Sequence, residues 1–231
     1  MKGKKKNGYR WIPLESNPSI FNDYFHQIGL KENFIFNELF SFDYKEVQDI
    51  KSENVYAVIL NFLKIVPNAK IYNQNNFVSD SSLFYMHQTD PLTNACGVVA
   101  GIHSIANISS SLNPISKNSL LEEFIKEKKT PEEYAQDLSE NEKWKEFHLK
   151  IASNGSSQIP EKMEDVKHHY VSFVINKGNL YELDGRLNMP YKVNENVKQE
   201  ELLDKVIDVV KGRLQRKEMN NLFSIMFIEK N

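Results

Sequence analysis

Cys96, the one cysteine of the chain, stands where a thiol is expected to be reactive. Apolar residues recur at helical spacing after it, from Val98 to Ala106, and predict a buried helix. Before it, segment 90–94 (DPLTN) has the turn and cap chemistry with which helices begin. We therefore expect Cys96 in the first turn of this helix, where unpaired N–H groups and the helix dipole favour an anion. This setting lowers the pKa of a thiol and increases the share of the reactive thiolate.

A lone cysteine is more often a small buried apolar residue than a nucleophile. The predicted place of Cys96 at the start of a helix favours the nucleophile, which then needs a general base and a group that orients the base. Both must come from elsewhere in the chain, which contains six histidines.

Distance and local context reduce the choice among the histidines. His103 lies seven residues after Cys96 on the same predicted helix, which is ~10 Å along the axis and too far for a hydrogen bond. His148 is expected near the end of a surface helix, and His26 on the outer face of another. His87 precedes the turn before Cys96, and no carboxylate is evident beside it.

A predicted hairpin supplies a better base. Segment 169–184 has the pattern of two strands joined by a two-residue Lys-Gly turn. In that register Val171 faces Asp184, so Asp184 is the diagonal neighbour of His169 on one face of the sheet. Their backbones are ~7–8 Å apart, over which an imidazole can reach a carboxylate. The same face carries Phe173 and is expected to pack on a buried helix.

Each of these residues also has an ordinary structural interpretation. His169 can simply begin a strand, and Asp184 followed by Gly185 can simply form a turn. Taken with a cysteine at a helix start, the pair favours a catalytic site. In that site Cys96 is the nucleophile, His169 the base and Asp184 the orienting carboxylate.

The order of predicted elements favours an α+β fold, because strands and helices alternate without a regular βαβ succession. Segment 17–29 predicts a helix from the N-cap Asn-Pro to a final glycine, and segment 55–63 a central strand buried on both faces. Two amphipathic helices are expected over 117–128 and 130–149, the second beginning with a capping box. The polar segment 152–164 breaks every periodicity and is expected to be a functional or disordered loop.

Charge and composition restrict the class of protein. The net charge is −2, but residues 1–10 carry five basic residues and no acid, which predicts a basic disordered tail. The rest of the chain holds 24 basic against 31 acidic residues, a net charge of −7 that argues against a nucleic-acid partner. One cysteine excludes an intrachain disulfide, and neither a signal peptide nor a membrane span is evident. We expect a cytoplasmic protein, and the basic tail leaves a nuclear location open.

Five motifs in the chain resemble those of the small, single-domain ubiquitin carboxyl-terminal hydrolases and occur in the family order. They are WIPLESNP, FYMHQT, NACG, TPEE and LYELDGR, and the resemblance runs from Trp11 to the last strand. It implies a papain-like, knotted α+β domain over residues 11–231, with a mainly antiparallel sheet flanked by helices. It also makes segment 152–167 the crossover loop that passes over the active site.

The resemblance implies a role for each residue of the site. Cys96 corresponds to the nucleophile, His169 to the general base and Asp184 to the group that orients the imidazole. Gln88, in FYMHQT, corresponds to the side chain of the oxyanion hole. It stands eight residues before Cys96, a longer spacing than the family has, so extra residues are expected within segment 89–93.

The resemblance also implies contacts with ubiquitin, whose C-terminal tail is basic. Glu15 and Glu38 match family positions of this kind, together with Pro13 and Leu14. An acidic protein body is compatible with such a partner. The ordinary interpretation of the two carboxylates is that they are solvated surface groups.

The resulting hypothesis is a monomeric thiol hydrolase that acts at the C-terminal glycine of ubiquitin without a metal or organic cofactor. Amide, ester or thioester bonds to small or unstructured leaving groups are the expected substrates. One alternative is a preference for a ubiquitin-like modifier of the Nedd type. Another is a catalytically weak ubiquitin-binding module, if the longer spacing before Cys96 displaces Gln88.

Overall fold

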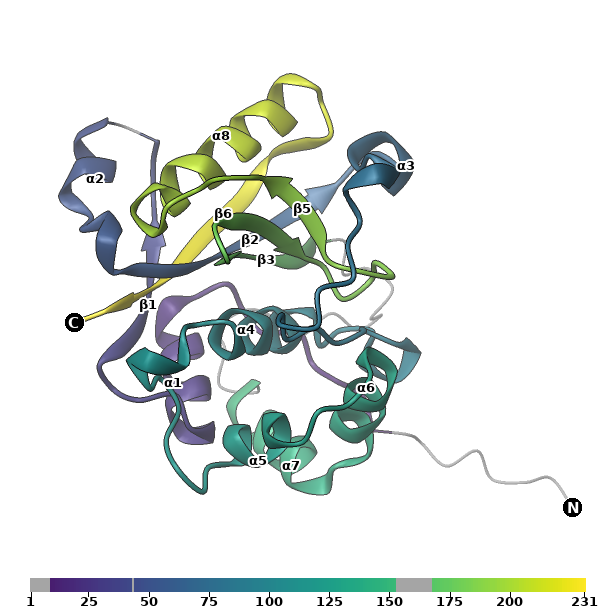
Figure 1. The fold of residues 1–231 in the computed structure, drawn as a ribbon. Coiled ribbons are helices and arrows are strands. Elements are labelled where there is room, and N and C mark those ends of the chain that lie inside the picture. Colours follow the sequence, from purple (N-terminus) through teal and green to yellow (C-terminus); the bar gives the residue numbers. More distant parts are fainter. Residues whose placement is uncertain (1–8, 43, 153–167) are drawn as a thin grey trace, which may run out of the picture.

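A six-stranded sheet forms the centre of the computed structural model, which describes residues 9–42, 44–152 and 168–231 (Figure 1). The strand order is β1-β6-β2-β3-β4-β5, and every neighbouring pair is antiparallel. The strands are β1 (Phe34–Leu39), β2 (Val55–Lys64), β3 (His168–Asn176), β4 (Asn179–Leu183), β5 (Tyr191–Asn194) and β6 (Met219–Lys230). The prediction of an α+β fold with a mainly antiparallel sheet is confirmed.

Strand β2 lies inside the sheet, between β6 and β3, as its continuous apolar sequence predicts. Ala57 and Ile59 belong to the core on one face of the sheet, and Val58 and Leu60 to the core on the other. Because both faces of the strand are covered, its sequence does not show the alternation of apolar and polar residues that is typical of a strand with one face in water.

The β3–β4 hairpin has the predicted register. Lys177 and Gly178 form its turn with φ values of 50° and 75°, and Asn176 pairs with Asn179. The pairing ends at Ser172 and Leu183. Asp184 therefore follows the last paired residue of β4 and lies beside the beginning of β3.

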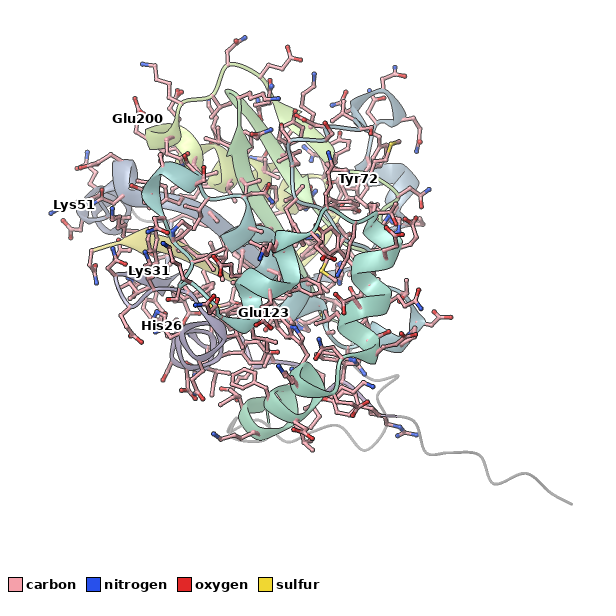
Figure 2. The ribbon with its side chains drawn as sticks, turned by 60° about the horizontal axis from the view of Figure 1, so that its bottom comes forward. His26, Lys31, Lys51, Tyr72, Glu123 and Glu200 are labelled. Carbon is pink, nitrogen blue, oxygen red and sulfur yellow. The ribbon has the colours of Figure 1, made fainter. Side chains whose placement is uncertain are left out.

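Helices cover both faces of the sheet and enclose two separate hydrophobic cores (Figure 1). Helix α8 (Leu202–Gln215) covers one face, with the short helices α2 (Tyr44–Asp49) and α3 (Asn68–Ile71) on the same side. The other face carries α1 (Pro18–Ile28), α4 (Cys96–Ala106), α5 (Leu120–Lys126), α6 (Pro131–Glu140) and α7 (Glu142–Ala152). Charged side chains such as Lys51 and Glu200 lie on the outside of the molecule (Figure 2).

Helix α4 is buried almost throughout and packs on β3 and β2. The Ser104 hydroxyl lies 2.7 Å from that of Ser172 on β3, so α4 covers the face of the hairpin to which the even-numbered residues of β3 belong. The face with Val171 and Phe173 packs in the core under α8 instead. The helix expected to cover that face is thus α8 and not the helix that carries Cys96.

Helix α1 has the predicted ends. The Asn17 side chain accepts a hydrogen bond from the Ser19 N–H at 2.9 Å, and Pro18 occupies the first helical position. Gly29 closes the helix at φ 131°, a conformation that a residue with a side chain rarely adopts.

The helix predicted over 130–149 is two helices. Its capping box, formed by Thr130 and Glu133, is present, but the helix stops at Asn141, where ψ is 110°. The Asn141 side chain then accepts from the Trp144 N–H at 3.3 Å and starts α7. The break at Asn141 lets α7 start in a new direction and place Trp144 fully buried in the core. The helical pattern of the sequence does not reveal this tertiary contact.

Some predicted features differ from the structure or lie outside it. The strand β5 was not predicted, because four partly exposed residues at a sheet edge give little signal. The predicted crossover loop and its part in the knot lie outside the described residues, apart from Ala152. Residues 1–8 of the predicted tail also lie outside the described residues, and at Tyr9 the hydroxyl donates to the Lys145 carbonyl at 2.8 Å. Within the described chain, no helix is long and apolar enough to cross a bilayer.

Packing between α1 and α4 leads to a prediction about stability. A Cβ atom at Gly101 would lie 1.9 Å from Cζ of Phe25, which is fully buried. Gly101→Ala is expected to reduce the free energy of unfolding by about 2 kcal/mol, because an overpacking cost near the upper end of about 1–3 kcal/mol exceeds the gain in helix propensity of about 1 kcal/mol. Gly212→Ala in α8 is the control, since its Cβ would meet only the flexible end of Arg216. Urea unfolding of both variants checks this, and equal stability of the two would contradict it.

Candidate active site

Cys96 is the first residue of α4, as predicted, but the cap differs from the prediction. Ala95 is the N-cap and supplies no side-chain hydrogen bond. Residues 90–92 form a 3-10 turn, and the Ala95 N–H donates to the Leu92 carbonyl at 2.8 Å. Without a capping side chain, the first N–H groups of α4 remain available to an anion beside the thiol.

The predicted base and its orienting carboxylate are in contact. His169 Nε2 lies 2.6 Å from Asp184 Oδ1, and both side chains are almost completely buried. The same carboxylate oxygen accepts from the Arg186 backbone N–H at 2.9 Å. Because Nε2 donates to Asp184, Nδ1 is the nitrogen left to take a proton from the thiol, and no oxygen or nitrogen of the described chain bonds it.

The charges around Cys96 favour its thiolate. Burial by itself raises the pKa of the thiol, but the interaction with His169, the Tyr170 backbone N–H and the charge of Arg186 together lower the pKa below its ordinary value. Burial by itself lowers the pKa of His169, whereas Asp184 and Cys96 raise it, and the net pKa lies above that of a free imidazole. These opposite shifts favour a thiolate beside an imidazolium.

The loop after β4 is tied to the segment that carries Gln88. The Tyr85 hydroxyl lies 2.7 Å from the carbonyl oxygens of both Asp184 and Leu187, so its one hydrogen is shared between them. The Gln88 N–H donates to the Gly185 carbonyl at 2.7 Å. A Cβ at Gly185 would lie 3.1 Å from the Gln88 backbone nitrogen, so the glycine permits this close approach.

The side chain of Gln88 is turned toward the extra residues before Cys96. Its amide nitrogen donates to the Leu92 carbonyl at 3.0 Å and to the Thr93 carbonyl at 2.7 Å. Its oxygen is buried and has no partner among the described residues. Both N–H donors are thus occupied, by carbonyls of the segment where the extra residues were expected.

His103 has a role that the sequence did not reveal. It is too far from Cys96 to act as the base, as predicted, but its Nε2 accepts from the Met86 N–H at 3.0 Å. Burial lowers its pKa to about 4, which keeps the imidazole neutral and able to accept. The Tyr85 ring stacks on it with centroids 5.2 Å apart, so His103 positions the segment between Phe84 and Gln88. The sequence offered one signal of this role, since His103 lies one turn before the end of a predicted buried helix, where a polar side chain needs a hydrogen-bond partner.

Two other histidines differ from their predicted surroundings. His148 was expected near a surface, but it is fully buried and its Nε2 lies 2.8 Å from the Ile12 carbonyl. His87 was thought to lack a carboxylate, but its Nδ1 lies 3.1 Å from Glu132. His26, predicted on the surface, is partly exposed and its Nε2 lies 2.7 Å from the Phe34 carbonyl.

Arg186 is a site residue that the sequence analysis did not single out, although it ends the LYELDGR motif. Its side chain is exposed, and Nη2 lies 3.4 Å from the Thr93 carbonyl. Its charge contributes to the lowered pKa of Cys96. A cation at the edge of the site stabilises negative charge on the sulfur.

The residues predicted to contact ubiquitin do not share one environment. Leu14 is buried at 3% exposure and its carbonyl accepts from the Tyr170 hydroxyl, so its side chain is not available to a partner. Pro13 and Glu15 are partly exposed in the same arm. Glu38 lies on the edge strand β1, and partial burial raises the pKa of its carboxyl. The Leu14 side chain fills the core beside α4, so a contact with ubiquitin at this position, which stays a prediction, would use the backbone.

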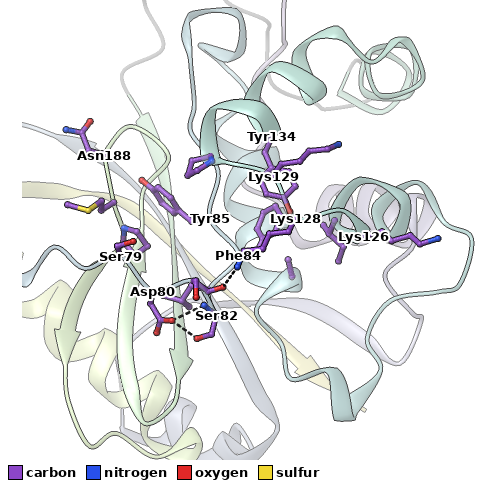
Figure 3. A pocket seen from close by; sticks show the side chains of 17 residues that line it. Ser79, Asp80, Ser82, Phe84, Tyr85, Lys126, Lys128, Lys129, Tyr134 and Asn188 are labelled. Atoms are coloured by element: carbon purple, nitrogen blue, oxygen red, sulfur yellow. Dashed lines mark hydrogen bonds between the residues drawn. The ribbon is translucent and has the colours of Figure 1, made fainter.

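A cavity of about 410 Å³ is lined by Tyr85 and lies between α5–α6 and the segments 79–84 and 188–190 (Figure 3). Lys126 and Lys128 line one wall and Asp80 another. The cavity reaches Ala106 at the far end of α4, ten residues from Cys96 or ~15 Å along the helix. It is therefore separate from the thiol. Over the residues described, no group of three His, Cys, Asp or Glu side chains is arranged to hold a metal.

A protein-family model relates this arrangement to known enzymes. The model, described as ubiquitin carboxyl-terminal hydrolase, family 1, matches residues 11–215. A ubiquitin carboxyl-terminal hydrolase of Aplysia californica is 35% identical over 90% of this chain and 96% of the relative. One from Saccharomyces cerevisiae is 29% identical over 76% of this chain and 74% of the relative.

A solved structure has the same fold. The catalytic domain of Trichinella spiralis UCH37, bound to ubiquitin vinyl methyl ester, superposes with a TM-score of 0.74 over 96% of each chain. The sequence identity in this superposition is 19%, so the likeness concerns the fold. The α+β architecture of the sheet and its covering helices is thus shared with that domain.

The opposite pKa shifts of Cys96 and His169 lead to a prediction about thiol reactivity. The rate of alkylation by iodoacetamide is expected to rise with an inflection below the ordinary thiol pKa of about 8.5. His169→Ala removes the charge that lowers the pKa, so its inflection should move to higher pH. His26→Ala, which changes a histidine on α1, serves as the control. An inflection that stays in place in His169→Ala would contradict the thiolate–imidazolium pair.

Proposed function

Since this chain belongs to family 1 of the ubiquitin carboxyl-terminal hydrolases and is a cysteine-dependent deubiquitinase, we propose that Cys96 attacks the carbonyl carbon of the C-terminal glycine of ubiquitin. The proposal depends most on the buried contact of 2.6 Å between His169 and Asp184 beside the one cysteine. The ubiquitin-bound Trichinella spiralis relative supports ubiquitin as the partner.

The first half of the reaction uses the charges already present. The thiolate of Cys96 forms a bond to the carbonyl carbon, and the carbonyl electrons move to its oxygen. When the tetrahedral intermediate collapses, the imidazolium of His169 protonates the leaving amine, and a thioester with Cys96 remains. Asp184 keeps the imidazole oriented and stabilises its positive charge.

The second half restores the enzyme. His169, now neutral, takes a proton from a water molecule that attacks the thioester carbonyl. Ubiquitin leaves with a free C-terminal carboxylate, and the imidazolium is again beside the thiolate. The same sequence of steps hydrolyses amides, esters and thioesters, because only the leaving group changes.

We assign the oxyanion to the Cys96 backbone N–H and the Gln88 amide. The uncapped start of α4 supports the first donor. Gln88 donates to two neutral carbonyls in this structure, so it must exchange one of them for the oxyanion. A charged acceptor forms the stronger hydrogen bond and favours that exchange.

Other parts of the proposal concern the substrate. Glu15 and Glu38 are proposed to face the basic tail of ubiquitin, in agreement with the acidic balance of the chain after residue 10. Small or unstructured leaving groups are proposed from the family resemblance of segment 152–167, and a monomer is proposed as the active form.

A second candidate function follows from the occupied donors of Gln88. If the 3-10 turn over 90–92 keeps both of them, the oxyanion loses a donor and the protein binds ubiquitin while turning it over slowly. Turnover therefore separates the two functions.

The function is tested with a fluorogenic amide of the ubiquitin C-terminus. Hydrolysis by the unmodified chain is expected, and Cys96→Ala should reduce kcat by about 10⁴-fold or more because it removes the nucleophile. The variant should still bind ubiquitin in a calorimeter. Faster turnover of the matching amide of a Nedd-type modifier would contradict the preference for ubiquitin, and labelling of Cys96→Ala by a ubiquitin vinyl-sulfone probe would contradict the nucleophile.

Gln88→Ala is expected to lower kcat by about 10²-fold with little change in KM, the usual effect of losing one oxyanion donor. Gln88→Glu keeps the shape but places a carboxylate near the oxyanion, so it should be at least as slow. A loss of only a few-fold in both variants would mean that the turn over 90–92 retains the amide. That result would favour the ubiquitin-binding module.

A further inference from the structure

A buried guanidinium on the α8 side of the sheet has a donor without a partner. Arg213 is 3% exposed, and Nη2 donates to Glu182 at 2.6 Å. Its Nη1 has no hydrogen-bond partner in the part of the chain that is described. An unpaired buried N–H costs about 1–3 kcal/mol, and more on a charged group, so its presence needs an explanation.

Close contacts hold this guanidinium in place. Its central carbon lies 5.6 Å from the ring centroids of both Phe62 and Tyr72. The hydroxyl of Tyr72 (labelled in Figure 2) donates to the other oxygen of Glu182 at 2.8 Å. Each oxygen of Glu182 thus accepts one hydrogen bond, from Tyr72 or from Arg213 Nη2, and neither accepts one from Nη1.

Arg213 lines a cavity of about 310 Å³ beside α8 and β5. The lining is mostly polar and includes two further cations, Lys205 and Arg216. Arg216 is held at the rim by two hydrogen bonds to Glu218, at 2.7 and 3.0 Å. Asp208 is the one carboxylate of the lining besides Glu182.

We propose that this cavity is a binding site for one phosphate group, held by Arg213, Lys205 and Arg216. Three cationic side chains line the cavity, and donors from several residues suit a tetrahedral anion better than a planar carboxylate. A guanidinium that is already fixed binds phosphate with little loss of entropy. The exposed Asp208 carboxylate limits the affinity and disfavours ligands with more negative charge next to it.

The proposed site is distinct from the active site and does not depend on the proposed function. Helix α8 lies on the opposite face of the sheet from α4, which carries Cys96 (Figure 1). The two sites are connected along the chain, since Glu182 on β4 precedes Asp184 by two residues. Cys96 and His169 do not line this cavity.

The test is a titration of the full chain with inorganic phosphate, followed by nuclear magnetic resonance at constant ionic strength. Saturable shifts are expected for the amides of Asn194 and Lys205 and for the Nε–H of Arg213. Acetate should shift the same signals with affinity several-fold weaker. Shifts that do not saturate, or that sodium chloride reproduces, would overturn the site and assign Nη1 to a water molecule.

Two variants of α8 make the test specific. Lys205→Gln should weaken phosphate binding about three- to fivefold, the size expected for a partly exposed charge. Lys211→Gln is the matched control on the same helix, since Lys211 lies over the Phe42 ring and not in the cavity. Equal affinities of the two variants would overturn the assignment.

A third experiment distinguishes free phosphate from the phosphate group of a phosphorylated protein as the ligand. A peptide with one phosphoserine is compared with the same peptide unphosphorylated. Binding of inorganic phosphate without a gain from the peptide identifies a free-anion site. Tighter binding of the phosphopeptide than of inorganic phosphate identifies a segment of a phosphorylated protein as the ligand.

Discussion

The buried contact between His169 and Asp184 is the interaction on which the rest of the site depends. A carboxylate and an imidazole that are both removed from water must satisfy each other, because an unpaired buried charge costs several kcal/mol. The pair fixes which ring nitrogen is left for the thiol, and Asp184 raises the pKa of the imidazole, which favours its charged form. His169, which stabilises the thiolate of Cys96, is thus oriented by Asp184 before any substrate binds.

That contact is held by a second set of residues around it. Tyr85 bonds the backbone of the Asp184 loop and stacks on His103, which in turn holds the Met86 N–H. Gly185 lets the same loop approach the backbone of Gln88. The Asp184 loop, the segment that carries Gln88 and α4 therefore form one packed unit, in which a shift of one element displaces the others.

The sheet keeps two buried charged groups apart. Glu182 and Asp184 are close in sequence on the same chain segment, but Glu182 turns to Arg213 under α8 while Asp184 meets His169. Each carboxylate has its own cation, so neither pair competes for the partner of the other. The Arg213 pair holds β4 to α8 at the strand that leads into the site.

The sequence by itself determined the α+β class, the central strand β2, the caps of α1, the place of Cys96 at the start of α4 and the β3–β4 register that brings His169 to Asp184. These follow from local signals, since strand periodicity and a two-residue turn fix which residues are neighbours. The tertiary structure alone decided the direction of the Gln88 amide, the burial of Leu14, the break at Asn141 and the supporting role of His103. Those features depend on contacts between segments distant in sequence, where packing and burial, which no local pattern records, choose the partner of each polar group.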